Sequence, residues 1–131
     1  MTNYASLEFM YSGATSWHPG NREADSALRI AESAIDRAAR DCGVEMVHEY
    51  SWPDGSLYRV IRTPESAVDA AYRIQLLADK YAKADSHQTV SVYGVSPLPI
   101  SNGMYHTAAG DVPIKDWFDS RIPVLNAGRD G

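Results

Sequence analysis

Residues 44–66, VEMVHEYSWPDGSLYRVIRTPES, decide the predicted fold because they contain two strand patterns, a turn signal and the start of a helix. Residues 44–50 and 57–62 hold several β-branched and aromatic residues, which favour strands. Between them lies Pro-Asp-Gly, in which proline presets φ and glycine accepts a positive φ, so a hairpin is predicted. With Asp54 and Gly55 as the two turn residues, the expected cross-strand pairs are Trp52–Leu57, Tyr50–Arg59 and His48–Ile61.

Helical patterns flank this hairpin on both sides. Before it, apolar residues recur at three- and four-residue spacing over residues 22–42, and Gly43 is expected to end that helix. After it, Thr63 suits an N-cap and Pro64 suits the first helical position. These signals predict a second helix that runs to about Ala84.

Two further strands complete the predicted unit. Residues 4–12 alternate between apolar and polar side chains, and residues 88–96 place Val90 and Val92 on the face opposite Tyr93 and Val95. The order β-α-β-β-α-β over residues 1–96 predicts an α+β, ferredoxin-like sandwich, with a four-stranded antiparallel sheet and two helices on one face.

Residues 97–131 are expected to form a C-terminal extension packed on the same domain. Asn102-Gly103 predicts a hairpin turn, and Trp117 with Phe118 should anchor a short helix. The apolar residues of this extension should cover the open face of the sheet, including Tyr58, Val60 and Tyr93.

The charge distribution argues against a nucleic-acid partner. The chain has 131 residues, the length of one domain, and a net charge of −5 without a basic tract. The third strand offers Tyr58, Arg59 and Arg62 on the expected open face, but it lacks the Gly-aromatic pattern of RNA-recognition domains.

The single cysteine, Cys42, excludes a disulfide within the chain and fits a reducing compartment. The N-terminal residues lack the basic and apolar regions of a signal peptide, and no apolar run is long enough to span a membrane. We therefore expect a cytoplasmic protein that does not bind membranes. Cys42 itself is expected in the core, at a helix C-terminus that disfavours a thiolate.

No motif for a cofactor, a metal or a phosphate group is present. The four histidines, His18, His48, His87 and His106, do not have the spacing of a helical metal site, and no glycine-rich phosphate loop occurs. His18, in the stretch TSWHPGNRE (residues 15–23), is expected in a solvated loop, although the fold would allow it to lie near His87.

These observations predict a non-enzymatic protein that binds another macromolecule. Small acidic domains without catalytic motifs are often inhibitors or adaptors that occlude a protein partner, and phage-type inhibitors of bacterial defence, such as anti-CRISPR proteins, are one example. Tyr50 and Glu49 on the free edge strand, Trp52 at the hairpin tip and Trp17 are the expected contacts. The same edge strand would also allow a homodimer.

The alternative interpretation is a small-ligand-binding domain or a small enzyme. Its site would lie between the sheet and the C-terminal extension and would use His87, His106, Tyr93 and Arg59.

Overall fold

A computed structural model describes residues 3–11, 22–51, 56–86 and 88–127. The first six elements are β1 (Asn3–Tyr11), α1 (Arg22–Asp41), β2 (Glu45–Ser51), β3 (Leu57–Thr63), α2 (Ala67–Ser86) and β4 (Val90–Leu98). They are followed by β5 (Ile100–Ser101), β6 (Met104–Thr107), β7 (Gly110–Pro113) and α3 (Ile114–Ala127). The protein therefore has the mixed α+β architecture that the sequence predicts.

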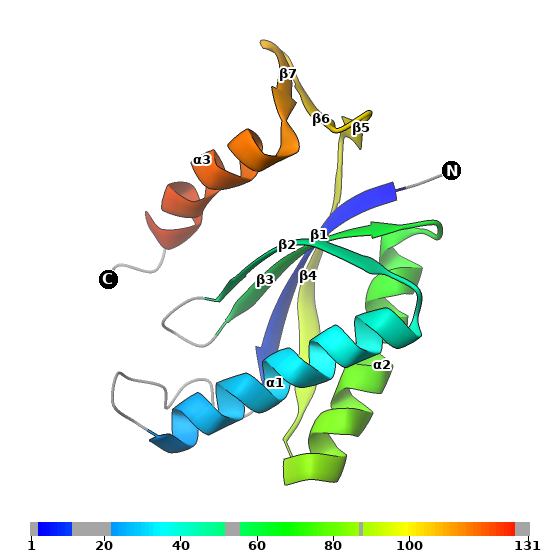
Figure 1. Ribbon diagram of the computed structural model, residues 1–131, viewed down its shortest axis with the longest axis vertical. Coiled ribbons are helices and arrows are strands. Elements are labelled where there is room, and N and C mark those ends of the chain that lie inside the picture. The colour runs from blue at the N-terminus through cyan, green and yellow to red at the C-terminus, as the bar shows by residue number, and fades with distance from the viewer. Residues whose placement is uncertain (1–2, 12–21, 52–55, 87, 128–131) are drawn as a thin grey trace.

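The main sheet has the strand order β2-β3-β1-β4, and each neighbouring pair is antiparallel (Figure 1). The prediction of a four-stranded antiparallel sheet is confirmed. Leu7 and Phe9 of the central strand β1 are fully buried, together with Ile35 of α1 and Ile74 of α2. The main core thus lies between the sheet and these two helices.

The expected hairpin register is wrong by one residue. The observed pairs are Tyr50–Tyr58, Glu49–Arg59 and Ser51–Leu57. Trp52, Asp54 and Gly55 lie outside the described residues. Residues two apart in a strand share a face, so Arg59 lies on the helix side of the sheet with Leu57 and Ile61, instead of on the open face. The observed register places Glu49 opposite it.

A bulge in β4 changes which of its side chains face the helices. Glu8 pairs with Gly94 and Phe9 with Val92, so Tyr93 is the extra residue of the bulge. Val92 and Val95 therefore both pack against the main core. Tyr93 keeps 50% of its surface exposed, and the expectation that the extension covers it is wrong.

The helix boundaries follow local hydrogen bonds. Gly43, with a φ of 71°, ends α1 as expected, and the bond from the Val44 N–H to the Ala39 carbonyl completes a Schellman motif. The second helix begins later than expected because Ser66 is its N-cap, accepting a bond from the Asp69 N–H at 3.2 Å. Thr63 is the last residue of β3.

The C-terminal extension is larger than expected. It forms a three-stranded sheet in the order β5-β6-β7 and the 14-residue helix α3. Phe118 of α3 packs against Tyr58 and Val60, on the face of the main sheet opposite α1 and α2 (Figure 1). Asn102 and Gly103 have positive φ values of 52° and 75° and form the predicted turn between β5 and β6. None of the described helices is long and apolar enough to cross a membrane.

Candidate functional site

The two edges of the main sheet differ in how they are covered. At the β4 edge, the Val90 N–H donates to Oδ1 of Asp79 at 3.0 Å, and the Val92 N–H donates to Oε1 of Gln75 at 2.7 Å. Both acceptors come from α2, so this helix satisfies backbone donors of the edge strand. Within the described part of the chain, β2 pairs only with β3, which leaves the outer side of β2 without a neighbouring strand.

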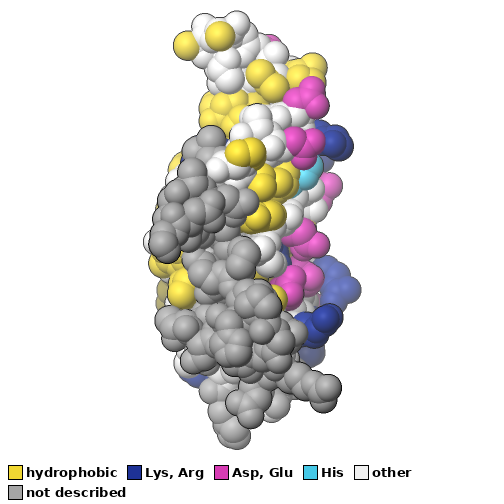
Figure 2. Space-filling view, turned by 90° about the vertical axis from the view of Figure 1, so that its left-hand side faces the viewer, with side chains coloured by type: hydrophobic (Ala, Val, Ile, Leu, Met, Phe, Trp, Pro, Cys, Tyr) yellow, Lys and Arg dark blue, Asp and Glu magenta, His cyan; other side chains and the backbone are white. Residues whose placement is uncertain are grey.

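A groove runs beside β2, between this strand and α1. Its volume is about 620 Å³. Its lining combines apolar side chains with charged ones: Asp36, Ala39, Arg40, Val44, Glu45, Met46, Val47, His48 and Glu49. Figure 2 shows one face of the molecule, on which acidic and basic side chains follow one margin next to a hydrophobic band. Three carboxylates against one arginine give the groove a negative balance.

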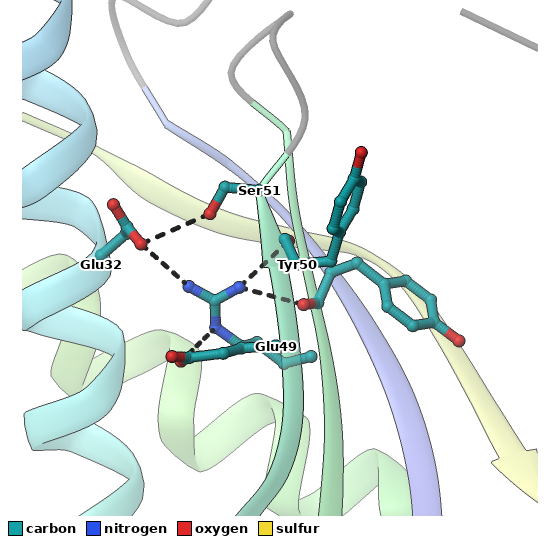
Figure 3. Close-up of polar contacts among 6 residues, drawn as sticks. Glu32, Glu49, Tyr50 and Ser51 are labelled. Carbon is teal, nitrogen blue, oxygen red and sulfur yellow. Dashed lines mark hydrogen bonds and ion pairs between the residues drawn. The ribbon is translucent and has the colours of Figure 1, made fainter. Parts of the chain in front are cut away.

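Arg59 lies under this edge, and its side chain is fully buried. Figure 3 shows Glu32 of α1 beside Glu49, Tyr50 and Ser51 of β2, with dashed lines for the polar contacts of this cluster. Nη1 of Arg59 donates to the Tyr50 carbonyl at 3.1 Å and to the Tyr58 carbonyl at 3.0 Å. Carboxylates of α1 and β2 lie on two sides of the guanidinium, with Glu32 at 3.6 Å from Nη2 and Glu49 at 3.6 Å from Nε. Arg59 therefore links the edge strand to the helix that forms the other wall of the groove.

Burial perturbs the charges of this cluster. Desolvation lowers the pKa of Arg59, while Glu49, Asp36 and Glu32 act against this change. Desolvation also raises the pKa of Asp36, and Arg59 partly opposes the rise. Nε and Nη2 of Arg59 and Oδ1 of Asp36 are buried without a hydrogen-bond partner among the described residues. Nη1 of the guanidinium is thus held by hydrogen bonds to two carbonyls, whereas Nε and Nη2 are held by ion pairs at 3.6 Å.

The predicted partner-binding residues have different environments. Glu49 is exposed beside the groove. Tyr50 is half-buried and packs against the cluster of Tyr58, Val60 and Phe118, so it is not the exposed anchor that the sequence suggests. Trp52 and Trp17 lie outside the described residues, as do His18 and His87.

His48 lies on the same face of β2 as Tyr50, and the sequence assigns it no role. Its ring stacks on Phe118 with a centroid distance of 4.5 Å and an interplanar angle of 8°. Burial lowers the pKa of His48, which favours the neutral ring. His48 therefore connects the groove to α3.

The structure does not assemble the ligand site expected from Arg59, Tyr93 and His106. Arg59 is buried on the helix side, Tyr93 is on the β4 bulge, and His106 is on the small sheet. A hollow of about 340 Å³ does lie between the main sheet and the extension. Its lining consists of other residues: Ser6, Glu8, Tyr58, Ser96, Pro97, Leu98, Tyr105, Trp117 and Arg121.

Two clusters were missed at the sequence level. Strand alternation already places Arg59 beside inward-facing Leu57 and Ile61, and the Glu32–Asp36 pair has the spacing of one helix face. The second cluster contains Ser101, His106 and Asp111, which three short strands bring together. Their equal five-residue spacing has no recognised meaning in a sequence whose extension is expected to be a simple hairpin.

Comparison with known proteins adds no relative. No protein-family model matches the chain, and a search of curated proteins finds no match.

Proposed function

We propose that this chain is a protein-binding module that receives an extended, cationic segment of its partner along β2. In this role it acts as a small inhibitor or adaptor that occludes the bound segment. The difference between the two sheet edges carries the proposal: α2 covers backbone donors of β4, whereas β2 borders an open groove. An added strand would gain main-chain hydrogen bonds from β2 and side-chain contacts from the groove.

The charge of the groove supports a cationic segment over a second copy of the chain. Asp36, Glu45 and Glu49 line it together with Arg40, whereas Arg59 and Arg62, the ion-pair partners of Glu49 and Glu45, are not among the lining residues. A two-fold pairing of β2 strands would bring Glu45 and Glu49 of one copy close to the carboxylates of the other, which is unfavourable. Lys or Arg side chains of another protein would be attracted instead, and such charges mainly increase specificity and association rate.

The architecture that presents this edge is proposed to be ferredoxin-like. The sheet order β2-β3-β1-β4, with α1 between β1 and β2 and α2 between β3 and β4, supports this assignment. In such a sandwich β2 and β4 are the edges, and α2 covers one of them here.

A peptide library tests the proposed function. Random peptides of about 10 residues, displayed on phage, are selected on the immobilised protein, and the selected sequences are measured in solution. We expect peptides with Lys or Arg at alternate positions, together with slower hydrogen exchange of β2 amides in the complex.

Two lysine substitutions provide matched variants. Glu45→Lys changes the groove at an exposed residue whose ion pair with Arg62, at 3.5 Å, adds little stability. It should weaken peptide binding tenfold or more, about 1.4 kcal/mol. Ser91→Lys adds a cation on exposed β4 and should leave binding within twofold. Equal binding to both variants, or no change in β2 exchange, would contradict the proposal.

A further inference from the structure

A chain of hydrogen bonds joins three side chains on one face of the small sheet. Oγ of Ser101 lies 2.5 Å from Nε2 of His106, and Nδ1 of His106 lies 2.7 Å from Oδ1 of Asp111. Ser101 is at the end of β5, His106 is in β6 and Asp111 is in β7.

The strand register explains why these side chains meet. Ser101 pairs with Met104, and His106 pairs with Asp111. Paired residues share a face of the sheet, as do residues two apart in a strand such as Met104 and His106. All three polar side chains therefore project from one face. Tyr105 faces the other way and stacks on Trp117 of α3 at 4.5 Å, which holds β6 in place.

The two contacts of His106 assign roles to its ring nitrogens. A carboxylate accepts only, so Nδ1 donates its proton to Asp111. Nε2 of the neutral ring is then the acceptor for the Ser101 hydroxyl. This order of serine, imidazole and carboxylate is the arrangement in which a histidine removes the proton of a nucleophilic hydroxyl.

A hollow beside Ser101 has the size of a small-molecule site. Its volume is about 460 Å³. It is lined by Tyr4, Arg62, Ile100, Ser101, Asn102 and Gly103. Arg62 is the cation of this lining, and its half-exposed guanidinium is available to a carboxylate as well as to Glu45. The lining also contains Asn102, whose side-chain amide can donate hydrogen bonds.

We propose that Ser101, His106 and Asp111 form an acyl-transfer site for small esters that carry a carboxylate. Ser101 Oγ forms a bond to the ester carbonyl carbon as its proton passes to Nε2 of His106. The C–O bond to the alcohol then breaks, and the alcohol leaves with that proton. Water releases the acid in the reverse sequence, with its proton passing through Nε2 to Ser101. Ser101 and His106 are the catalytic residues, and Asp111 is a positioning residue.

This site and the β2 groove are linked by the Glu45–Arg62 ion pair, but the acyl adduct on Ser101 and the slowed exchange of β2 amides are separate measurements, so either proposal can fail without the other. His106 and Asp111 have side chains that are 42% and 57% exposed, which gives water direct access to the acyl intermediate. The same exposure weakens the electrostatic support for the imidazole, so the rate gain should come mainly from proton transfer, about 10²–10⁴-fold.

The test compares 4-nitrophenyl hemisuccinate, which carries a carboxylate, with neutral 4-nitrophenyl acetate on the full chain. We expect faster release of nitrophenol from the hemisuccinate and an acyl adduct on Ser101, located by peptide mass spectrometry. Ser101→Ala should abolish the adduct, and His106→Gln should slow acylation 100-fold or more. Ser91→Ala, which removes an exposed hydroxyl of β4, is the matched control and should react like the parent protein.

Two further variants separate chemistry from structure. Asp111→Asn should slow acylation because the imidazole loses the carboxylate that orients it. Asp111→Glu restores a carboxylate and should recover part of the rate, whereas a purely structural role would give no such rescue. Arg62→Gln should raise KM for the hemisuccinate several-fold and leave hydrolysis of the acetate unchanged. Adducts on residues other than Ser101, or Ser101→Ala acylation as fast as that of the parent protein with circular dichroism unchanged, would overturn the proposal.

Discussion

Arg59 is the residue whose environment differs most from its usual place on a protein surface. It is fully buried, yet its carboxylate partners come from half-exposed Glu32 and exposed Glu49. Such a cluster is asymmetric because the carboxylates reach water when the ion pair is lost, whereas the guanidinium does not. Glu49→Lys would therefore affect folding as well as binding, because it places a second cation beside Arg59.

This asymmetry makes a prediction for stability. The double variant Glu32→Gln and Glu49→Gln leaves Arg59 with much less compensation and should lower the free energy of unfolding by about 3–5 kcal/mol. Arg59→Met keeps a long side chain and frees Glu32 and Glu49, which reach water, while Asp36 loses a neighbouring cation. Its loss should therefore be smaller than that of the double variant. Urea denaturation at neutral pH measures both values. An Arg59→Met loss equal to that of the double variant would show that the guanidinium, and not its compensation, dominates.

His48 predicts how stability depends on pH. Burial lowers its pKa in the folded state from the ordinary value of 6.5, so the unfolded chain binds the proton more readily. Its contribution is complete above 6.5 and is lost as the pH falls from 6.5 through the lower folded-state pKa. We expect unfolding midpoints in urea to fall between about pH 7.5 and about pH 5.5, and His48→Gln to reduce that fall. Asp36 acts in the opposite direction in acid because its folded-state pKa is raised, so the comparison between variants isolates His48.

At the scale of the elements, the helix ends and sheet edges are determined by a few hydrogen bonds. The Schellman motif at Gly43 lets the chain leave α1 and enter β2 within a few residues. The contacts of Gln75 and Asp79 with β4 fix α2 along the opposite edge. The Schellman motif therefore leads the chain directly from α1 into β2, and the side chains of α2 satisfy two N–H groups of the edge strand β4.

Gly43→Ala tests the Schellman motif at the end of α1. The φ of Gly43 is 71°, and an added Cβ would meet no other residue within 4 Å, so the cost is that of backbone strain alone. The expected loss is about 1 kcal/mol, and Gly43→Asn should cost less because asparagine tolerates this conformation better. Thermal unfolding of the three proteins gives the order; equal losses for Ala and Asn would contradict it.

The double variant Gln75→Ala and Asp79→Ala tests the hydrogen bonds between α2 and the edge strand β4. It removes acceptors for two N–H groups of β4 and should cost about 1–3 kcal/mol. It should also create a second open edge and increase self-association, measured by sedimentation velocity. Lys80→Ala, on an exposed position of the same helix, is the control and should change neither property. A double variant that stays as monodisperse as the control would show that this edge is protected in another way.

At the scale of the whole molecule, the sheet has a core on each face. The larger one lies under α1 and α2, and a smaller one of Tyr58, Val60 and Phe118 lies under α3. The two cores depend on different parts of the chain, although they share the strands between them. Truncations on the two faces should therefore have different consequences.

Phe9→Ala and Phe118→Ala compare the two cores. Phe9 is fully buried in the larger core, so its truncation should cost about 3–5 kcal/mol and destabilise the whole domain. Phe118 of α3 is 6% exposed and belongs to the smaller core. Its truncation should lower the free energy of unfolding by less than that of Phe9 and should increase hydrogen exchange mainly in α3. Protection factors along the chain distinguish the cases. Uniform loss of protection in Phe118→Ala would mean that α3 is an integral part of the cooperative unit.

The sequence by itself determined the elements that local chemistry specifies. The apolar spacing of residues 22–42 predicts α1, Gly43 predicts its end, and Asn102-Gly103 predicts the turn that the positive φ values confirm. The alternation in β1 and β3 likewise predicts strands. These signals act within a few residues, where propensity and caps decide the conformation.

Only the tertiary structure decided the bulges, the register and the side-chain clusters. The extra residues Val47 and Tyr93 form bulges, which bend a strand and increase its twist, and no local pattern in the sequence marks their positions. The hairpin register, one residue away from the expected one, places Glu49 and not Tyr50 opposite Arg59, which brings this carboxylate into the ion cluster. The Ser101–His106–Asp111 chain depends in the same way on cross-strand pairing. Register is a property of the packed sheet, because a shift of one residue places every side chain of a strand on the opposite face.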